Sequence, residues 1–292
     1  MVQLQFVVPG FSKCGTTTLC ELLGHHPSIF IPESKEPGYF AENHRRGAEW
    51  YAQWFAKAQP GQLRGDGSTT YSSREFVEQA CARLVENNPA MKFIFIARHP
   101  LRRLESSYRE MHHSGYKYGI EAEFDMGRML DTFPNMLADS RYWSLLDVFR
   151  ERVSDDRILT VLLEDLQRNP AAELRRCFRF LEVDPDVEIM DLERQCNSGS
   201  EKYYDTRFLR RLKKNGWVSK ALRALSQRRR EKTFRQWGLR RRFTTAIQWA
   251  PETLARVQHE LDDEATNFLD FCGRSPDCWE WPTSRHANLS TT

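Results

Sequence analysis

The chain has 292 residues, of which 40% are hydrophobic and 12% aromatic, so it can bury one large core or two small ones. Its net charge of +3 is too small to indicate an acidic partner, and no apolar run approaches the roughly 20 residues that a bilayer span needs. The N-terminus starts with a strand pattern instead of a basic and apolar leader, so we expect a soluble, cytoplasmic protein. The seven cysteines include no CxxC pair and no zinc-ligand spacing, which favours reduced thiols, although Cys272 and Cys278 could close a small disulfide loop.

Strand and helix patterns alternate along the chain, which predicts an α/β fold with a central parallel sheet and helices on both faces. The predicted strands are 3–8, a short one around 63, 92–97 and 158–163, and the predicted helices are 16–23, 74–86, 100–111, 171–181 and 251–271. The run at 92–97 is apolar on both faces, so we expect it inside the sheet. We expect a single domain over residues 1–292, with a basic helical segment at about 200–245 and a disordered tail at 283–292.

The stretch FVVPGFSKCGTTTL (Phe6–Leu19) joins the first strand to the first helix through a turn bounded by Gly10 and Gly15. Unpaired N–H groups at the start of a helix, together with the helix dipole, favour a bound anion. Lys13 adds a cation inside the turn. Three hydroxyl donors follow: Thr16, Thr17 and Thr18. The sequence therefore predicts a phosphate-binding loop, and an ordinary strand-to-helix turn is the simpler alternative.

The loop differs in two ways from the P-loop that binds nucleoside triphosphates, and these differences favour another kind of phosphate site. Gly10 and Gly15 have the GxxxxG spacing of that motif, but Thr16 stands where it requires lysine. The strand at 92–97 is followed by Arg98, where P-loop enzymes usually carry an aspartate that helps to hold magnesium. We therefore expect a cationic site without a metal. A P-loop kinase and a non-catalytic protein that binds anions or nucleic acid stay open as alternatives.

A second cationic cluster follows the predicted inner strand, in KFIFIARHPLRRLESSYREM. Arg98 lies at the end of the strand, and Ser106 lies eight positions later on the next helix. Because sites in α/β sheets form at the carboxyl ends of the strands, we expect Arg98 and the first loop to face one crevice. Two separate phosphate-binding points predict a ligand that carries phosphates at two places.

These motifs resemble those of the sulfotransferases that use 3′-phosphoadenosine 5′-phosphosulfate (PAPS). SKCGTTTL is similar to the 5′-phosphosulfate loop of that family, and RHPLRRLESSY is similar to its 3′-phosphate motif. HPSIFIPESKEPGYF, GDGSTTYSS and LTVLLEDLQRNP follow in the order found in the carbohydrate-directed, heparan-type branch and its bacterial relatives. The resemblance covers about Val7–Leu181. It implies PAPS as donor, adenosine 3′,5′-bisphosphate as product, no metal, and nucleotide binding by Lys13, Cys14, Gly15, Thr16, Thr17, Thr18, Arg98 and Ser106.

The implied reaction also assigns catalytic residues. A sulfuryl group carries less negative charge than a phosphoryl group, so fixed cations near the leaving phosphate can replace magnesium. The resemblance implies that Lys13 stabilises charge on that phosphate and that Glu36 in KEPGYF is the general base for an acceptor hydroxyl or amine. Alternatively, Glu36 is a surface carboxylate paired with Lys35 or with a nearby arginine. The acceptor, whether saccharide, lipid or small natural product, is not identified by the sequence.

Two positions depart from the family pattern. Cys14 stands where glycine or serine is usual, a change that we expect to be tolerated. Gly67 replaces a lysine that some heparan-type members carry beside Ser68, so we expect one fewer cation around the transferred group. Asp66 and Ser68 could orient substrate, but capping of a turn is at least as good an interpretation.

The remaining candidates have structural or open interpretations. The run Arg207–Arg242 is strongly basic and fits a solvated helical face, a groove for an acidic acceptor, or a nucleic-acid or membrane surface. We favour the first two because no recognised nucleic-acid module accompanies it. Core packing is favoured over adenine stacking for Tyr142 and Trp143. Structural roles are favoured for three histidines: His25, His26 and His99.

Overall fold

The computed structural model describes residues 2–115, 122–189, 203–214, 233–243 and 247–282, and every structural statement below concerns these residues. The chain forms two compact units. The first comprises Met1–Arg103, Pro134–Ser198 and Arg256–Trp281, and the second comprises Leu104–Phe133, Gly199–Ala255 and Pro282–Thr292. The single domain expected from the sequence stays a prediction, and its expected disordered tail at 283–292 lies outside the described residues.

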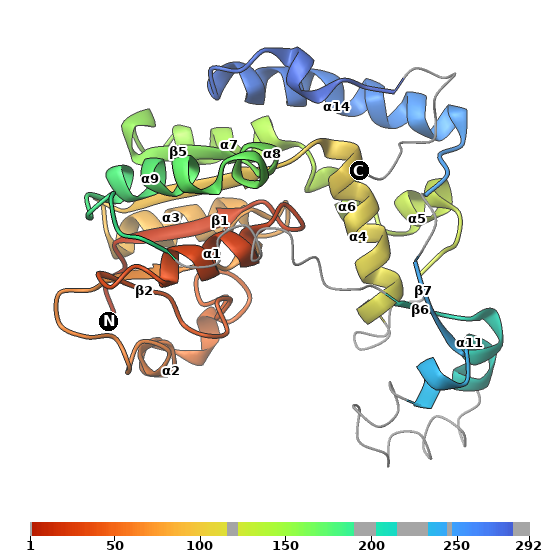
Figure 1. Ribbon diagram of the computed structural model, residues 1–292, viewed down its shortest axis with the longest axis horizontal. Coiled ribbons are helices and arrows are strands. Elements are labelled where there is room, and N and C mark those ends of the chain that lie inside the picture. Colours follow the sequence, from red (N-terminus) through yellow and green to blue (C-terminus); the bar gives the residue numbers. More distant parts are fainter. Residues whose placement is uncertain (1, 116–121, 190–202, 215–232, 244–246, 283–292) are drawn as a thin grey trace. The chain divides into compact units, whose positions relative to one another are not determined.

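A five-stranded parallel sheet lies in the first unit and confirms the predicted α/β fold (Figure 1). The strand order is β2-β3-β1-β4-β5, and all neighbouring strands are parallel. Strand β4 pairs with β1 on one side and β5 on the other, as expected for a strand that is apolar on both faces. The strands are β1 (Phe6–Gly10), β2 (Ile29–Phe30), β3 (Leu63–Asp66), β4 (Lys92–Ala97) and β5 (Ile158–Leu162).

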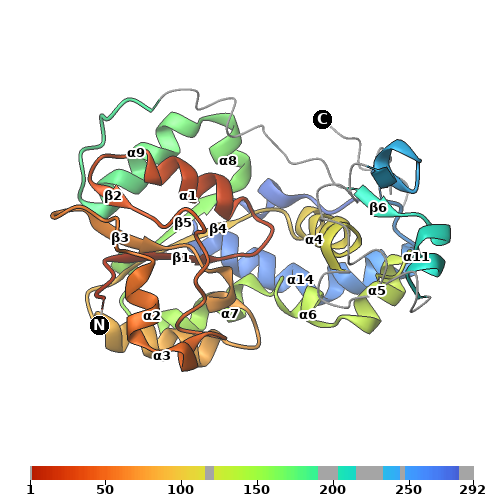
Figure 2. The same cartoon turned by 90° about the horizontal axis from the view of Figure 1, so that it is seen from below.

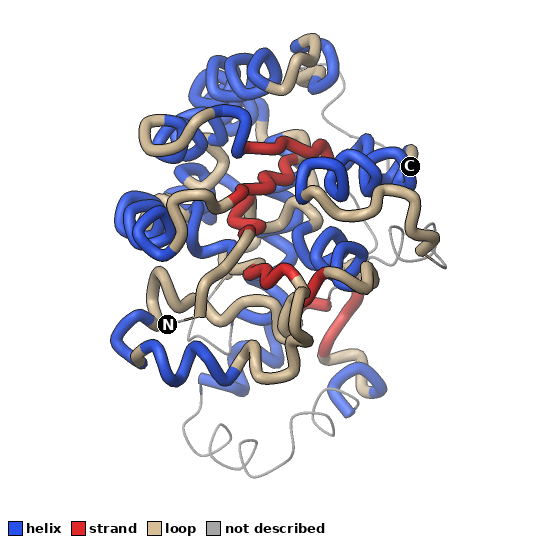
Figure 3. The backbone as a smooth tube through the Cα atoms, turned by 90° about the vertical axis from the view of Figure 1, so that its left-hand side faces the viewer, coloured by secondary structure: helices blue, strands red, loops and turns tan. Residues whose placement is uncertain are grey.

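Helices cover both faces of this sheet, as the sequence predicts. Helices α1 and α9 lie on one side of the strands, and α2, α3 and α7 lie on the other (Figure 2). The tube view likewise shows strands in red between helices in blue (Figure 3). The helices of this unit are α1 (Thr16–Gly24), α2 (Ala48–Gln53), α3 (Val77–Asn87), α6 (Asn135–Ala138), α7 (Tyr142–Arg150), α8 (Leu163–Arg168) and α9 (Pro170–Leu181), with 3₁₀ turns at His44–Arg46, Thr69–Ser72, Asp155–Arg157 and Pro276–Trp279.

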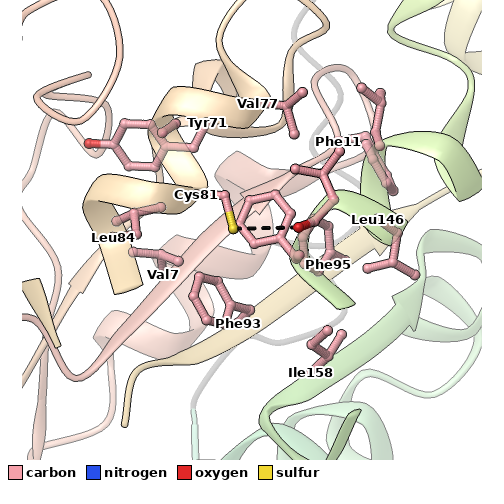
Figure 4. Packing of buried hydrophobic residues seen from close by; sticks show 14 of the residues in the cluster. Val7, Phe11, Tyr71, Val77, Cys81, Leu84, Phe93, Phe95, Leu146 and Ile158 are labelled. Atoms are coloured by element: carbon pink, nitrogen blue, oxygen red, sulfur yellow. Dashed lines mark hydrogen bonds between the residues drawn. The ribbon is translucent and has the colours of Figure 1, made fainter. Parts of the chain in front are cut away.

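Successive residues of the strands fill two hydrophobic cores, one on each face of the sheet. Val7, Phe93 and Phe95 share one core with Leu84 of α3 and Leu146 of α7 (Figure 4). The other core receives the alternate positions of the same strands: Phe6, Val8, Ile94 and Ile96. Burial on both faces fixes β1 and β4, and therefore fixes the positions from which the loops after these two strands start.

The boundary between the units falls inside two predicted helices, α4 (Pro100–Ser114) and α14 (Pro251–Phe271). The rest of the second unit contains α5, α11 and a two-stranded antiparallel sheet, β6-β7. The prediction of a basic helical segment at about 200–245 is therefore wrong at both β6 and β7, where Arg240 and the buried Asp205 approach within 3.1 Å across the two strands. Residues 215–232 of that segment lie outside the described part. The bounds are α5 (Met126–Thr132), β6 (Tyr203–Asp205), α11 (Arg207–Lys214) and β7 (Arg240–Arg242).

Three further features of the described residues concern membrane crossing, cysteine pairing and metal ligands. None of the described helices combines the length and apolar character that crossing a membrane requires. Six cysteines fall within the described ranges and all are free, so Cys272 and Cys278 do not form the small disulfide loop. The described residues contain no group of three or more His, Cys, Asp or Glu side chains arranged to hold a metal ion.

Candidate active site

The predicted anion-binding loop is a tight turn between β1 and α1. The N–H of Phe11 donates to a carbonyl of β4 (2.6 Å), and the N–H of Cys14 donates back to the Phe11 carbonyl (3.2 Å). Lys13 (φ 67°) and Gly15 (φ 92°) both adopt the left-handed conformation. A Cβ on Gly15 would lie 2.6 Å from Cδ1 of Leu163. Backbone conformation and space therefore both require glycine at position 15.

Helix α1 starts directly from this turn without a side-chain cap. Its N-cap residue is Gly15, and its first turn contains no acidic residue. The N–H groups of the first turn therefore point to the loop without a capping carboxylate or hydroxyl, which is the arrangement that binds an anion. The hydroxyl-bearing residues of this turn differ in exposure: Thr16 is buried, Thr18 half-buried and Thr17 exposed. This geometry supports the predicted anion site.

Arg98 lies against the same loop. It follows β4 directly, and its Nη1 donates to the carbonyl of Lys13 at 3.5 Å. Its Nε is buried and has no hydrogen-bond partner among the described residues. The structure thus brings Arg98 and the loop together, and an unsatisfied buried donor at this point suits an anionic ligand. Ser106 is half-buried on α4 in the second unit, so its role in binding stays a prediction.

Arg103 supports the loop from inside the protein, and sequence reasoning missed it. Its side chain is only 1% exposed. Nε donates to the carbonyl of Ser12 (3.1 Å) and Nη2 to the Ser12 hydroxyl (2.8 Å), while Nη1 donates to the carbonyl of Met136 (2.7 Å). Its position in the helix could have indicated that it is buried, because it lies between Leu101 and Leu104, whose apolar side chains are buried.

Cys14 faces the core instead of the anion site. Its Sγ lies 3.4 Å from the hydroxyl of Tyr142, which donates to the carbonyl of Arg98 (3.0 Å). The thiol also donates to the carbonyl of Ser12 (3.7 Å), so both polar atoms of this contact have a backbone acceptor. Burial raises the pKa of the Cys14 thiol, so the side chain stays neutral. Tyr142 is fully buried, in agreement with the predicted core role, and cysteine is tolerated in the loop because it packs beneath it.

Glu36, the predicted base, lies beside Lys35, which contacts the loop at Thr16. Its side chain is 46% exposed and forms an ion pair with Lys35. The Nζ of Lys35 also donates to the hydroxyl of Thr16 (3.4 Å) and to the carbonyl of Gly67 (3.1 Å). The Lys35 partner that the alternative interpretation expected is therefore present, but the pair lies beside the anion-binding loop. The base role of Glu36 stays a prediction.

Asp66 and Ser68 form a buried polar cluster that shapes the turn after β3. Oδ2 of Asp66 accepts from the hydroxyls of Tyr51 (2.8 Å) and Tyr71 (2.7 Å), and Oδ1 accepts from the N–H of Ser68 (2.9 Å). Burial raises the pKa of Asp66, while these hydrogen bonds act in the opposite direction. Because both carboxylate oxygens are occupied, the structure favours the turn-forming interpretation over substrate orientation.

The buried His26 and the half-buried His99 are both held by backbone groups. His26 accepts from the N–H of Ser28 (3.0 Å) and contacts a carbonyl through Nε2. His99 accepts at Nδ1 from the N–H of Leu101 (3.1 Å), which leaves its Nε2–H to donate to the carbonyl of Glu280 (3.0 Å). Burial lowers the pKa of His99 to about 4. With both ring nitrogens occupied, neither histidine has a lone pair available as a base, in line with the predicted structural roles.

Comparison with known proteins identifies the family. Residues 4–249 match the family model described as "Sulfotransferase domain", which is most of the chain. The chain belongs to the sulfotransferase family. The resemblance inferred from the loop and Arg98 motifs is thereby confirmed, and the chain also has the expected fold. A crystal structure of a sulfotransferase from Alicyclobacillus acidocaldarius superposes with a TM-score of 0.67 at 17% identity, covering 96% of this chain and 99% of that one.

Curated relatives include sulfotransferases directed at heparan sulfate. The chain is 25% identical over 211 residues to human heparan sulfate glucosamine 3-O-sulfotransferase 5, covering 69% of this chain and 59% of the relative. It is 32% identical over 106 residues to the membrane-associated sulfotransferase kil1 of Dictyostelium discoideum, covering 35% of this chain and 22% of that protein. This chain therefore spans less than two thirds of the length of either relative.

Proposed function

We propose that this protein transfers a sulfuryl group from PAPS to a hydroxyl or amine of an acceptor. One observation carries the proposal: Arg98 donates to the backbone of Lys13 in the uncapped glycine loop, so the two predicted phosphate-binding points share one site. A nucleotide with phosphates at its 5′ and 3′ positions has charges to occupy both points. Membership of the sulfotransferase family supports the same donor.

The residues of the site suit this nucleotide. The first-turn N–H groups of α1, Lys13 and the threonine hydroxyls would hold the 5′-phosphate, with Gly15 allowing close backbone approach. Cys14 would act through loop shape, because its N–H and thiol are already engaged. Arg98, whose buried Nε lacks a partner among the described residues, would hold the 3′-phosphate together with Ser106.

The chemistry assigned to these residues is electrostatic stabilisation plus proton removal. As the bond between sulfur and the 5′-phosphate oxygen breaks, negative charge grows on that phosphate, where Lys13 and the helix N–H groups stabilise it. The acceptor oxygen or nitrogen forms the new bond to sulfur, and its proton passes to the Glu36 carboxylate. Adenosine 3′,5′-bisphosphate leaves with the electron pair of the broken bond. The loops at the end of the sheet would also hold donor and acceptor in the orientation for reaction, which lowers the barrier further.

The acceptor class stays broad. A saccharide, a lipid and a small natural product all provide a suitable hydroxyl or amine. The curated relatives named for heparan sulfate make a saccharide the first class to test. Metal independence, a cytoplasmic location and the absence of a nucleic-acid partner stay predictions from the sequence.

Thermal unfolding with added nucleotides tests the proposal directly. A ligand that binds only the native state raises the melting temperature. We expect adenosine 3′,5′-bisphosphate to raise it in the presence of EDTA, and adenosine 5′-phosphate to raise it much less. Stabilisation by ATP that depends on magnesium, with no response to the bisphosphate, would contradict the proposal. Labelled PAPS and an acceptor library, analysed by mass spectrometry, would then identify the acceptor.

A further inference from the structure

Lys35 lies between the anion-binding loop and the predicted base. Its Nζ contacts three oxygens: the hydroxyl of Thr16 (3.4 Å), the carbonyl of Gly67 (3.1 Å) and the carboxylate of Glu36. An ammonium group has three N–H donors, so one proton is available for each contact. Lys35 is therefore positioned by three different segments of the chain, two of which belong to the proposed active site.

Packing and backbone hydrogen bonding hold the ammonium group of Lys35 in this position. The Lys35 side chain is only 11% exposed, which is unusual for lysine. Its stem runs over Gly67, where a Cβ would lie 3.4 Å from Cβ and Cδ of Lys35 and 2.6 Å from Sγ of Cys20. The N–H of Gly67 also donates to the carbonyl of Lys35 (2.9 Å). A Cβ at 67 would thus touch the lysine stem at ordinary contact distance and collide with Sγ of Cys20, while the backbone pairing fixes the position of the Lys35 main chain beside Gly67.

The order of groups along the site assigns a role to this cation. In an in-line displacement the leaving oxygen and the attacking oxygen lie on opposite sides of sulfur. If the loop holds the leaving phosphate and Glu36 takes the acceptor proton, the sulfuryl group lies between them. Lys35 contacts Thr16 of the loop and Glu36 at once, so its ammonium lies beside that intermediate position.

We propose that Lys35 binds the oxygens of the transferred sulfuryl group. This inference rests on the proposed function. The hydroxyl of Thr16 is the most distant of the three acceptors and is neutral, so an anionic sulfuryl oxygen can replace it. The ion pair with the half-exposed Glu36 contributes little net stability, so the ammonium can also turn from that carboxylate toward the donor. Such a turn would release the Glu36 oxygen that contacts Lys35, so that both carboxylate oxygens could take the acceptor proton.

The two nucleotides of the reaction provide the test, because PAPS carries the sulfuryl group and adenosine 3′,5′-bisphosphate does not. We expect Lys35→Met to weaken PAPS binding about 10- to 100-fold, the range for losing a hydrogen bond to a charged group. The affinity for the bisphosphate should stay within about 2-fold of that of the unmodified protein, a change within the usual effect of a substitution that breaks no ligand contact. Isothermal titration of both nucleotides gives the comparison without an acceptor. Lys57→Met, at an exposed lysine of the same unit, is the control and should change neither affinity.

Each outcome separates this inference from the proposed function. Failure of the unmodified protein to bind either nucleotide would overturn the proposed function and, with it, the role of Lys35. Unchanged PAPS affinity in Lys35→Met would overturn the role of Lys35 alone. An equal loss for both nucleotides would mean that Lys35 holds the loop or the 5′-phosphate, and would also overturn it. Lys35→Gln, which keeps a neutral donor, provides the same comparison if the methionine variant does not fold.

Discussion

The guanidinium of Arg103 donates to both the carbonyl and the hydroxyl oxygen of Ser12, at 3.1 and 2.8 Å, and so ties the start of α4 to the loop between β1 and α1. The same guanidinium donates to the hydroxyl of Ser140 (2.9 Å). A buried arginine with this many acceptors acts as a rigid support for the loop backbone. The loop geometry therefore depends on a buried residue that lies outside the loop itself.

Arg103→Met should loosen the loop and destabilise the protein. The substitution keeps an apolar stem but leaves the carbonyls of Ser12 and Met136 without these buried donors, at a cost of about 3 kcal/mol in unfolding free energy. Urea unfolding measures this loss, and isothermal titration should show weaker binding of adenosine 3′,5′-bisphosphate. Arg168→Met, at a 74% exposed side chain, is the matched control. Normal bisphosphate affinity in Arg103→Met would show that the loop keeps its shape without the arginine.

Arg98→Ala should remove discrimination by the 3′-phosphate. Loss of one charge-assisted contact should weaken the binding of adenosine 3′,5′-bisphosphate by about 1.5 to 3 kcal/mol. The binding of adenosine 5′-phosphate should be nearly unaffected. Titration of both nucleotides into both proteins measures the difference. The competing explanation is that Arg98 holds the loop through the Lys13 carbonyl, in which case both nucleotides would lose affinity equally.

Strands β1, β4 and β5 could be predicted from the sequence because they are mostly continuous apolar runs, whereas the two-residue β2 was missed. Lys92–Ala97 has the predicted bounds, and α4 begins at the predicted Pro100. Strand β7 could not be predicted, since three consecutive arginines have no apolar alternation. Its pairing with β6 depends on Arg240 and Asp205, which are 35 residues apart in sequence and form a buried ion pair only after folding.

The parts of the site that a sequence motif marks, through a backbone conformation, could be predicted. The parts that depend on side chains from several segments of the chain were missed. Gly15 and Arg98 follow from strand ends and glycine spacing. The sequence suggested one fewer cation near the transferred group because glycine stands at 67. Lys35 approaches Gly67 from another segment and donates to its carbonyl, so it brings a cation to this position. Such a compensation depends on the tertiary fold, so no single motif reveals it.

His99 should make stability depend on pH below neutrality. Its pKa falls from the ordinary value near 6.5 to about 4 in the folded protein. Between these two values the unfolded chain binds a proton that the folded chain does not, so unfolding free energy falls as the pH falls, by at most about 3 kcal/mol. Urea unfolding from pH 7 to pH 4 should show a flatter profile for His99→Asn, because asparagine can still accept from the N–H of Leu101. The exposed His25→Asn is the control, and an equal slope in all three proteins would contradict the assignment.

Glu36→Gln should separate catalysis from nucleotide binding. Glutamine is close in size to glutamate but cannot take the acceptor proton at neutral pH. Turnover on a true acceptor should fall roughly 10²- to 10⁴-fold, the range for losing general base catalysis. Affinity for adenosine 3′,5′-bisphosphate should change by only about 0.5 kcal/mol or less, because the half-exposed carboxylate contributes nothing to the loop or to Arg98. Initial rates and titration of the same preparation measure both quantities.

The pH–rate profile decides whether Glu36 acts as the base or only as a partner of Lys35. If Glu36 is the base, its protonation produces the acidic limb of the profile, and that limb should vanish in Glu36→Gln. If Glu36 only pairs with Lys35, glutamine should leave both the limb and the turnover nearly intact. Glu33→Gln, at an exposed glutamate three positions earlier, should behave like the unmodified protein. Near-normal turnover in Glu36→Gln would mean that another residue is the base. Asp66 would be tested next, although both of its oxygens already accept hydrogen bonds. His99 is the weaker candidate because both of its ring nitrogens are engaged.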